Sequence, residues 1–173
     1  MDATIPKIHM IRALTSGADH DAEPTGLRAM TPEDIPRLGK LFLAAYVGTV
    51  DYEGESEQEA TAAVQATFKG EFGEFLGAAS SVIERSNKLV SASFITLWQG
   101  QPLLAFSVTA PEHKGSGLAG KCIGASMQAL VRAGYEELHL FVTATNASAL
   151  SVYNRLGFSV ASAASLKKLT PSS

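Results

Sequence analysis

The sequence predicts an α+β fold of three layers, in which a central, mixed and mostly antiparallel sheet is flanked by about four helices. Three apolar segments, residues 80–85, 89–98 and 103–109, follow one another across connections of only a few residues, and this spacing favours an antiparallel meander. Helical and strand-like patterns then alternate from residue 118 to residue 158. At 173 residues, the chain is long enough to bury the core of one domain.

The composition argues against several classes of partner. The chain has 46% hydrophobic and 18% charged residues, and no apolar run approaches the ~20 residues that span a bilayer. With a net charge of -3 and no basic stripe, we expect neither a nucleic acid nor a membrane as partner. One cysteine excludes an internal disulfide, and the N-terminus lacks the apolar core of a signal peptide. We therefore expect a cytoplasmic protein.

Residues 1–26 are predicted to be an N-terminal extension of a domain that spans residues 27–173. Apolar side chains are scattered over residues 1–14, and a turn-rich segment follows at residues 15–26. The extension is expected to be a flexible tail, a short helix or a strand that binds a partner, because chain termini are commonly mobile. The domain should begin with a short strand at residues 27–30.

Two helices are predicted next. Thr31 is suited to cap a helix with its hydroxyl, Pro32 suits the first helical position, and two acidic residues follow. Apolar residues then recur at every third or fourth position up to Ala45, so this first helix is amphipathic. An acidic stretch, residues 51–59, leads into a second helix that ends near Phe68.

A glycine-rich segment, residues 111–124, predicts a binding site for a phosphate group. It holds four of the fifteen glycines, follows an apolar strand and opens a helix. Glycines allow tight turns and a close approach to a ligand, and the N–H groups of a helix's first turn have no partner within the helix. No acidic residue lies between His113 and Tyr135, whereas three cations do, so the segment favours an anion.

Two kinds of phosphate site fit this segment. The run from Gly115 to Cys122 nearly matches the nucleotide-binding P-loop, Gly-x4-Gly-Lys-Ser/Thr. Cys122, however, stands where a hydroxyl should bind magnesium, and a thiol is a poor ligand for that ion. No aspartate follows the next predicted strand, residues 138–142, so the P-loop is disfavoured. Cys122, in the helix that follows the glycine-rich loop, and His139, in the strand at residues 138–142, are predicted to be structural residues.

Two segments resemble the motifs of the GNAT N-acetyltransferase superfamily. Residues 114–119, Lys-x-x-Gly-x-Ala, are similar to the [Arg/Gln]-x-x-Gly-x-[Gly/Ala] motif that holds the pyrophosphate of acetyl-CoA, although Lys114 replaces the usual Arg or Gln. Residues 140–158 are similar to the family's strand, Asn, helix, Tyr and Gly-Phe ending. The resemblance implies the GNAT fold, in which the strand ending at Thr109 splays away from a parallel neighbour.

The resemblance also implies acetyl-CoA as cosubstrate and a role for each matching residue. Asn146 caps the last helix and would reach toward the pantetheine arm. Tyr153 would be the general acid for the departing thiolate, because a phenol is protonated at neutral pH and close in acidity to a thiol. The remaining cofactor-binding residues implied are Val108, Thr109 and Ala110 along the pantetheine, and Lys114, Gly115, Ser116, Gly117, Leu118 and Ala119 at the pyrophosphate.

The acids of the second-helix region have two interpretations. Seven acids lie between positions 51 and 74 against one lysine. They are either solvated and favoured by the dipole of the helix N-terminus, or, as the resemblance suggests, some line an acceptor pocket and attract a cationic amine. Glu53 and Glu55, in a loop before the helix, are the better candidates for acceptor binding or for the general base. Glu84 is a third candidate base by its charge alone. No metal-ligand spacing occurs, so we expect no metal.

The resemblance implies an enzyme that transfers an acetyl group, by direct attack, to a primary amine of a small molecule, amino acid or peptide. The alternative is a GNAT-fold protein that binds and senses acyl-CoA without turnover, and the presence of Asn146 and Tyr153 favours the enzyme. Relatives usually end in a hairpin of two strands, whereas residues 158–169 can supply one. We therefore expect residues 1–14, or a second subunit in a homodimer, to complete the sheet edge.

Overall fold

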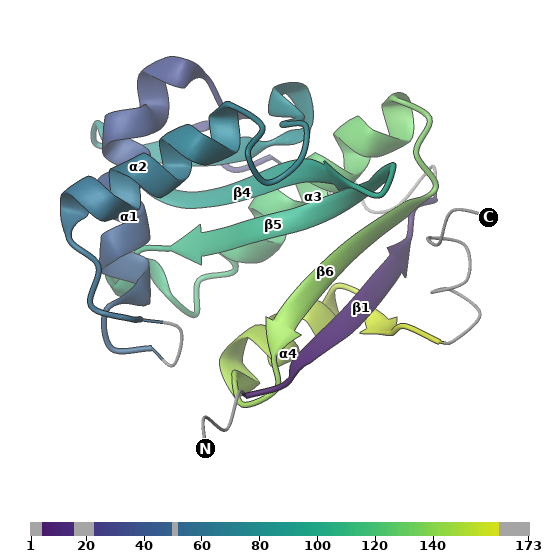
Figure 1. Ribbon diagram of the computed structural model, residues 1–173. Helices are drawn as coiled ribbons and strands as arrows, with labels where there is room; N and C mark the ends of the chain where they lie inside the picture. Colours follow the sequence, from purple (N-terminus) through teal and green to yellow (C-terminus); the bar gives the residue numbers. More distant parts are fainter. Residues whose placement is uncertain (1–4, 16–22, 50–51, 163–173) are drawn as a thin grey trace.

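The computed structural model describes residues 5–15, 23–49 and 52–162. It contains a seven-stranded sheet of order β2-β3-β4-β5-β6-β1-β7 (Figure 1). Every neighbouring pair is antiparallel except β5 and β6, which are parallel, so the predicted fold class is confirmed. The strands are β1 (Lys7–Ala13), β2 (Leu27–Ala29), β3 (Ser81–Arg85), β4 (Lys88–Trp98), β5 (Gln101–Thr109), β6 (Glu137–Thr143) and β7 (Ser159–Val160).

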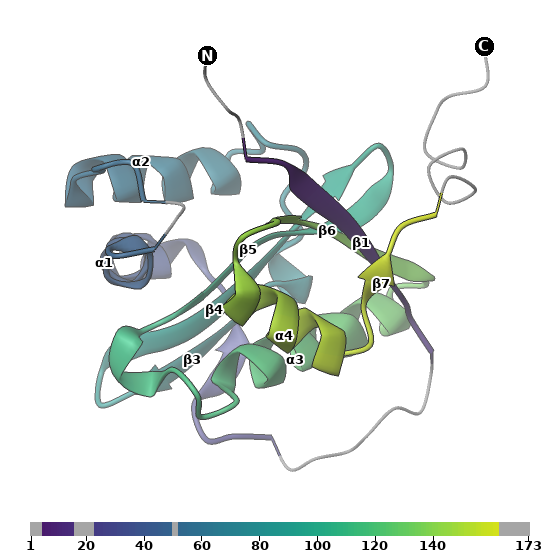
Figure 2. The ribbon, with the colours of Figure 1, turned by 90° about the horizontal axis from the view of Figure 1, so that it is seen from below.

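Four α-helices cover the sheet in two layers. Helices α1 (Ile35–Tyr46) and α2 (Glu57–Phe68) lie on one face, and α3 (Leu118–Arg132) and α4 (Ala147–Arg155) lie on the other (Figure 2). One core cluster joins α1 and α2 to β4 and β5, and a second joins α3 and α4 to β6 and β1. None of the described helices is both long and apolar enough to cross a membrane.

Strand β1 comes from residues 1–26, which the sequence predicts to be an N-terminal extension. It pairs with β6 over seven residues, from Lys7 opposite Thr143 to Ala13 opposite Glu137, and its other edge pairs with β7. Met10 is only 2% exposed and belongs to the second core cluster. Residues 7–13 are therefore an interior strand of the same sheet, whereas residues 1–4 and 16–22 lie outside the described part.

Because β1 is paired on both of its edges, the reason for expecting a homodimer no longer holds. The N-terminal segment itself fills the place between β6 and β7, which was one of the two alternatives. One strand was expected within residues 158–169. The structure has the short strand β7, Ser159–Val160, in this range, and residues 163–169 lie outside the described part.

The parallel strands β5 and β6 meet only at their beginnings. Leu103 and Leu104 pair with His139 and Leu140, after which the strands diverge (Figure 1). On the opposite edge of β5, the Ala110 N–H donates to the Val90 carbonyl at 2.8 Å. Because successive residues of a strand direct their backbone groups to opposite edges, the N–H and C=O groups of residues 107 and 109 face the gap between β5 and β6.

His139 is a structural residue, as predicted. Its side chain is fully buried, with Nδ1 3.0 Å from Nε2 of His9 on β1 and Nε2 3.3 Å from the Glu137 carboxylate. Burial lowers the pKa of both histidines, which keeps the pair neutral at neutral pH. Trp98 on β4 is half-buried and packs edge-on against the ring of Phe141, with the ring centroids 5.1 Å apart.

Gly39 lies where α1 crosses α2. A Cβ atom at this position would come within 2.8 Å of Thr61 Cβ and 2.9 Å of Thr61 Cα, too close for the two helices to keep their spacing. We expect Gly39→Ala to lower the free energy of unfolding by about 1–3 kcal/mol through overpacking. Denaturation in urea, followed by circular dichroism, measures this change.

Gly124 in α3 provides the matched control. A Cβ at Gly124 would meet no atom within 4 Å, so only the helix propensity changes. We expect Gly124→Ala to raise the free energy of unfolding by about 0.5–1 kcal/mol, because glycine is the poorer helix former. A Gly39→Ala protein as stable as Gly124→Ala would show that α1 and α2 are not closely packed at this crossing.

Candidate active site

Two cavities open on the gap between β5 and β6, and they share two residues. The larger has a volume of about 580 Å³ and the smaller about 350 Å³. Ser107, from the splayed part of β5, and Tyr153, from α4, line both cavities. A ligand that extends from one cavity into the other would therefore pass these two side chains.

The smaller cavity lies at the N-terminus of α3. Seven of the residues that the resemblance implies for the cofactor line it, namely Thr109, Lys114, Gly115, Gly117, Leu118, Ala119 and Tyr153. His113, Gly120 and Arg155 also line it. Two exposed cations therefore border the cavity, Lys114 from the loop before α3 and Arg155 from α4. Arg155 was not predicted, because its distance from Lys114 in the sequence hides their proximity.

The backbone of this loop is suited to an anion. Gly115 and Gly117 have φ angles of 80° and 79°, a left-handed conformation that favours glycine. The backbone bonds of α3 begin with that from the Lys121 N–H to the carbonyl of Gly117, the N-cap residue, at 3.2 Å. The N–H groups of residues 118–120 precede it and have no acceptor within the helix, where the helix dipole is positive. Free N–H groups and a positive dipole together form a phosphate-binding site.

Four of the residues implied for the cofactor lie elsewhere. Val108 and Ala110 are buried in the first core cluster, and the N–H of Ala110 is bonded to β4. The Ser116 hydroxyl donates to the carbonyl of His113 and does not line the cavity. Asn146 lines the larger cavity instead, and its Oδ1 accepts a bond from the Ala149 N–H at 3.1 Å, as expected of a helix cap.

The environment of Cys122 argues against the P-loop interpretation. Its thiol is fully buried in a core cluster with Ile83 and Val90, and burial raises its pKa to about 11. A protonated thiol in an apolar core cannot take the place of the hydroxyl that binds magnesium. Among the described residues, no group of three or more acidic, histidine or cysteine side chains could hold a metal ion.

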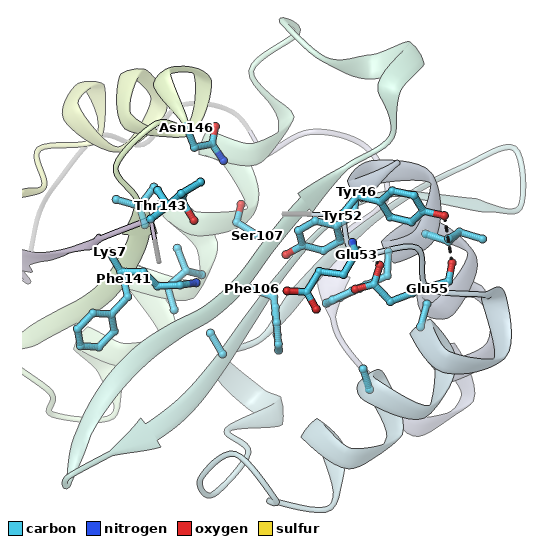
Figure 3. Close-up of a pocket in the computed structure, with 18 of the residues that line it drawn as sticks. Lys7, Tyr46, Tyr52, Glu53, Glu55, Phe106, Ser107, Phe141, Thr143 and Asn146 are labelled. Atoms are coloured by element: carbon cyan, nitrogen blue, oxygen red, sulfur yellow. Dashed lines mark hydrogen bonds between the residues drawn. The ribbon is translucent and has the colours of Figure 1, made fainter. Parts of the chain in front are cut away.

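The larger cavity has walls from two distant parts of the chain. Figure 3 shows Tyr46, Tyr52, Glu53 and Glu55 on one side and Lys7, Phe141 and Thr143 on the other, with Ser107 between them. The first group comes from α1 and the loop before α2, and the second from β1 and β6. Glu59, on the first turn of α2, also lines the cavity.

The structure therefore separates the three candidate acids. Glu53 and Glu55 line the larger cavity, as the functional interpretation requires. Glu84 lines neither cavity: its carboxylate accepts bonds from Arg37 at 2.7 Å and Arg28 at 3.0 Å. These bonds lower the pKa of Glu84 and occupy its carboxylate in an ion-pair network, which argues against Glu84 as the base.

Tyr153 is held by the short helix α4 at the junction of the cavities. The helix begins after the Asn146 cap, and the chain turns back at Gly157. The Tyr153 ring packs against Phe158 of the second core cluster, with ring centroids 5.9 Å apart. Packing on one side of the ring leaves Tyr153 half-buried and in contact with both cavities.

Comparison with known proteins identifies the family. Residues 38–158, more than half of the chain, match the acetyltransferase (GNAT) family. The chain belongs to the GNAT acetyltransferase family. Over 52 residues it is 40% identical to the mycothiol acetyltransferase of Corynebacterium aurimucosum, a stretch that covers 30% of this chain and 17% of that protein.

Solved GNAT structures share the fold at low sequence identity. A GCN5-related N-acetyltransferase from Sphaerobacter thermophilus superposes with a TM-score of 0.69 at 17% identity, covering 90% of this chain and 48% of that one. The ribosomal-protein-S18-alanine N-acetyltransferase of Escherichia coli gives 0.62 at 20% identity, covering 79% and 78%. The PaiA N-acetyltransferase of Thermoplasma acidophilum, solved with coenzyme A, gives 0.58 at 15% identity, covering 75% and 86%. The chain thus spans about half the length of the Sphaerobacter protein.

Proposed function

We propose that this GNAT-family chain is an acetyl-CoA-dependent N-acetyltransferase that acts on a primary amine by direct attack. The observation that carries the proposal is that Ser107 and Tyr153 line both cavities. One cavity has the free N–H groups and cations that suit a diphosphate, and the other has the carboxylates and aromatic rings that suit an amine. The reacting atoms would meet where the two cavities join.

The residues around the junction provide the groups that the reaction needs. The amine nitrogen would attack the thioester carbonyl carbon, and an N–H of residue 107 or 109 that faces the gap would stabilise the oxygen as it gains charge. When the C–S bond breaks, the thiolate would take the phenol proton of Tyr153. The surplus proton of the amine would leave through water or through a carboxylate of the larger cavity, for which Glu53 and Glu55 are candidates.

Binding and turnover together test this proposal. We expect calorimetry to detect acetyl-CoA binding, and a thiol-release assay with a panel of amines to detect turnover. Lys114→Ala should weaken acetyl-CoA binding about three- to tenfold and leave S-acetylpantetheine, which lacks the diphosphate, unaffected. Arg132→Ala is the control, because this exposed cation at the end of α3 lines neither cavity.

Two outcomes would contradict the proposal in different ways. Tight acetyl-CoA binding without thiol release for any amine would support the sensor, which needs only the smaller cavity. The absence of acetyl-CoA binding would remove the basis of both functions.

The carboxylate-lined second cavity favours the enzyme, because a sensor has no need of an acceptor site.

A further inference from the structure

The charged residues that line the larger cavity have opposite signs on its two walls. Three carboxylates, those of Glu53, Glu55 and Glu59, line the wall formed by the α1–α2 loop and the start of α2. The only cation among the described lining residues is Lys7, on the opposite wall formed by β1 and β6 (Figure 3). Ser107 from β5 lies between the two walls, and Tyr153 lines the cavity from α4, so the carboxylates come from other elements than the two residues of the reacting end (Figure 3).

These carboxylates are not neutralised by the protein. None of Glu53, Glu55 and Glu59 forms an ion pair among the described residues, in contrast to Glu84 with its two arginines. In the part of the chain that the structure describes, the Glu53 N–H donates a hydrogen bond to the Glu55 carboxylate, at 3.1 Å, which orients Glu55. Their negative charge is thus available to a ligand in the cavity.

Aromatic rings in the larger cavity also favour a cationic ligand. Phe42, Tyr46, Tyr52 and Phe106 line the cavity beside the carboxylates, and the face of an aromatic ring attracts a cation. Phe42 and Phe106 pack edge to face at 5.0 Å, and both belong to or border the first core cluster, so this wall is fixed by the fold. A volume of about 580 Å³ is within the range of small-molecule sites.

On the basis of the proposed acetyltransferase function, we propose that the acceptor is a small diamine or polyamine. One amine reacts beside Ser107 and Tyr153, while a second, protonated amine binds to the carboxylates of Glu53, Glu55 and Glu59. Lys7 reinforces this orientation, because a positive charge on the opposite wall repels a protonated amine there and favours its binding at the carboxylates.

Three acceptors with four carbon atoms each test the proposed charge preference. Butylamine, 1,4-diaminobutane and 4-aminobutyrate present the same reacting amine with a neutral, a cationic and an anionic far end. We expect kcat/KM for the diamine to exceed that for butylamine at least tenfold, and 4-aminobutyrate to be the poorest acceptor. A series from 1,3-diaminopropane to 1,6-diaminohexane then gives the preferred separation of the two amines.

Single Glu→Gln variants test the residues. In Glu53→Gln, Glu55→Gln and Glu59→Gln, the ratio of kcat/KM for the diamine to that for butylamine should fall at least threefold. Glu57→Gln is the matched control, because Glu57 is an exposed carboxylate of the same helix turn that does not line the cavity. It should keep the wild-type ratio. The preference for the diamine should also weaken as salt concentration rises.

Each contrary result has a distinct meaning. Equal kcat/KM for butylamine and the diamine, or an unchanged ratio in all three variants, overturns this inference and leaves the acetyltransferase function intact. A preference for 4-aminobutyrate also overturns it and points to Lys7 as the group that recognises the acceptor. If no amine is acetylated although acetyl-CoA binds, the acetyltransferase function and this inference fail together.

Discussion

Replacing Tyr153 by phenylalanine is expected to lower kcat at least tenfold and to leave the affinity for acetyl-CoA within about twofold. The change removes only the hydroxyl, and the packing of the ring against Phe158 is kept, so the smaller cavity should retain its shape. What is lost is the proton for the departing thiolate, and general acid catalysis of this kind contributes typically 10²–10⁴-fold. Steady-state kinetics and calorimetric titration with acetyl-CoA measure the two quantities.

A second thioester separates proton donation from positioning. If Tyr153 donates a proton, an acetyl thioester of a more acidic thiol should lose less activity in Tyr153→Phe, because its leaving group has less need of the proton. If the hydroxyl only positions the substrate, both thioesters should lose activity by the same factor. Tyr135→Phe is the control, since Tyr135 is also half-buried against the second core cluster but lines neither cavity. Wild-type kcat in Tyr153→Phe would exclude the residue from the mechanism.

Local signals in the sequence were sufficient for much of the fold and for placing the glycine-rich loop at the start of a helix. The Thr31-Pro32 start of the first helical segment, the Asn146 cap and the glycine-rich loop each depend on residues within one or two turns. Helix α3 follows the glycine-rich loop and α4 follows the Asn146 cap, whereas Thr31 and Pro32 open a 3-10 turn, Pro32–Asp34, that leads into α1 at Ile35. Lys114, Gly115 and Gly117 line the same cavity. Short-range rules succeed at these positions because the groups that satisfy the backbone lie nearby in the chain.

The features that sequence reasoning left open or missed depend on contacts between distant segments. Residues 1–14 were one of two candidates for the sheet edge, but no local pattern predicts that β1 pairs with β6, as Met10 does with the distant Leu140. Lys7 reaches the larger cavity only because of that pairing. Ser107 is a further case, since its exposure to both cavities follows from the divergence of β5 and β6. A charge count likewise could not separate Glu53, beside the cavity, from Glu84, whose arginine partners come from other elements.

Replacing Asp34 by alanine is expected to lower the free energy of unfolding by about 2–4 kcal/mol, the largest effect on stability that we predict. The Asp34 side chain is 1% exposed at the start of α1. It accepts two bonds from Arg28 at 2.8 Å each, one from Arg37 at 3.0 Å and one from the Thr31 N–H at 2.9 Å. Its removal leaves these donors without a buried acceptor and disconnects the helix from β2.

The pH dependence of stability identifies the charge of Asp34 as the cause. Burial alone would raise the pKa of Asp34, but the bonds from Arg28 and Thr31 and the charges of Arg28 and Arg37 outweigh burial and lower the pKa to about 2. A carboxylate with a lowered pKa in the folded state stabilises the fold fully above its unfolded pKa of 3.8, and this contribution is lost as pH falls from 3.8 toward 2.

The comparison of wild type with Asp34→Asn uses this dependence. The difference in unfolding free energy should stay constant from pH 7 to about pH 4 and shrink below pH 4, because a protonated Asp34 resembles asparagine. Glu33→Gln is the control: Glu33 is exposed, and among the described residues it has no ion pair, so its effect should stay within about 0.5 kcal/mol. A difference that persists unchanged at pH 2.5 would show that the shape of the Asp34 side chain, and not its charge, stabilises the start of α1.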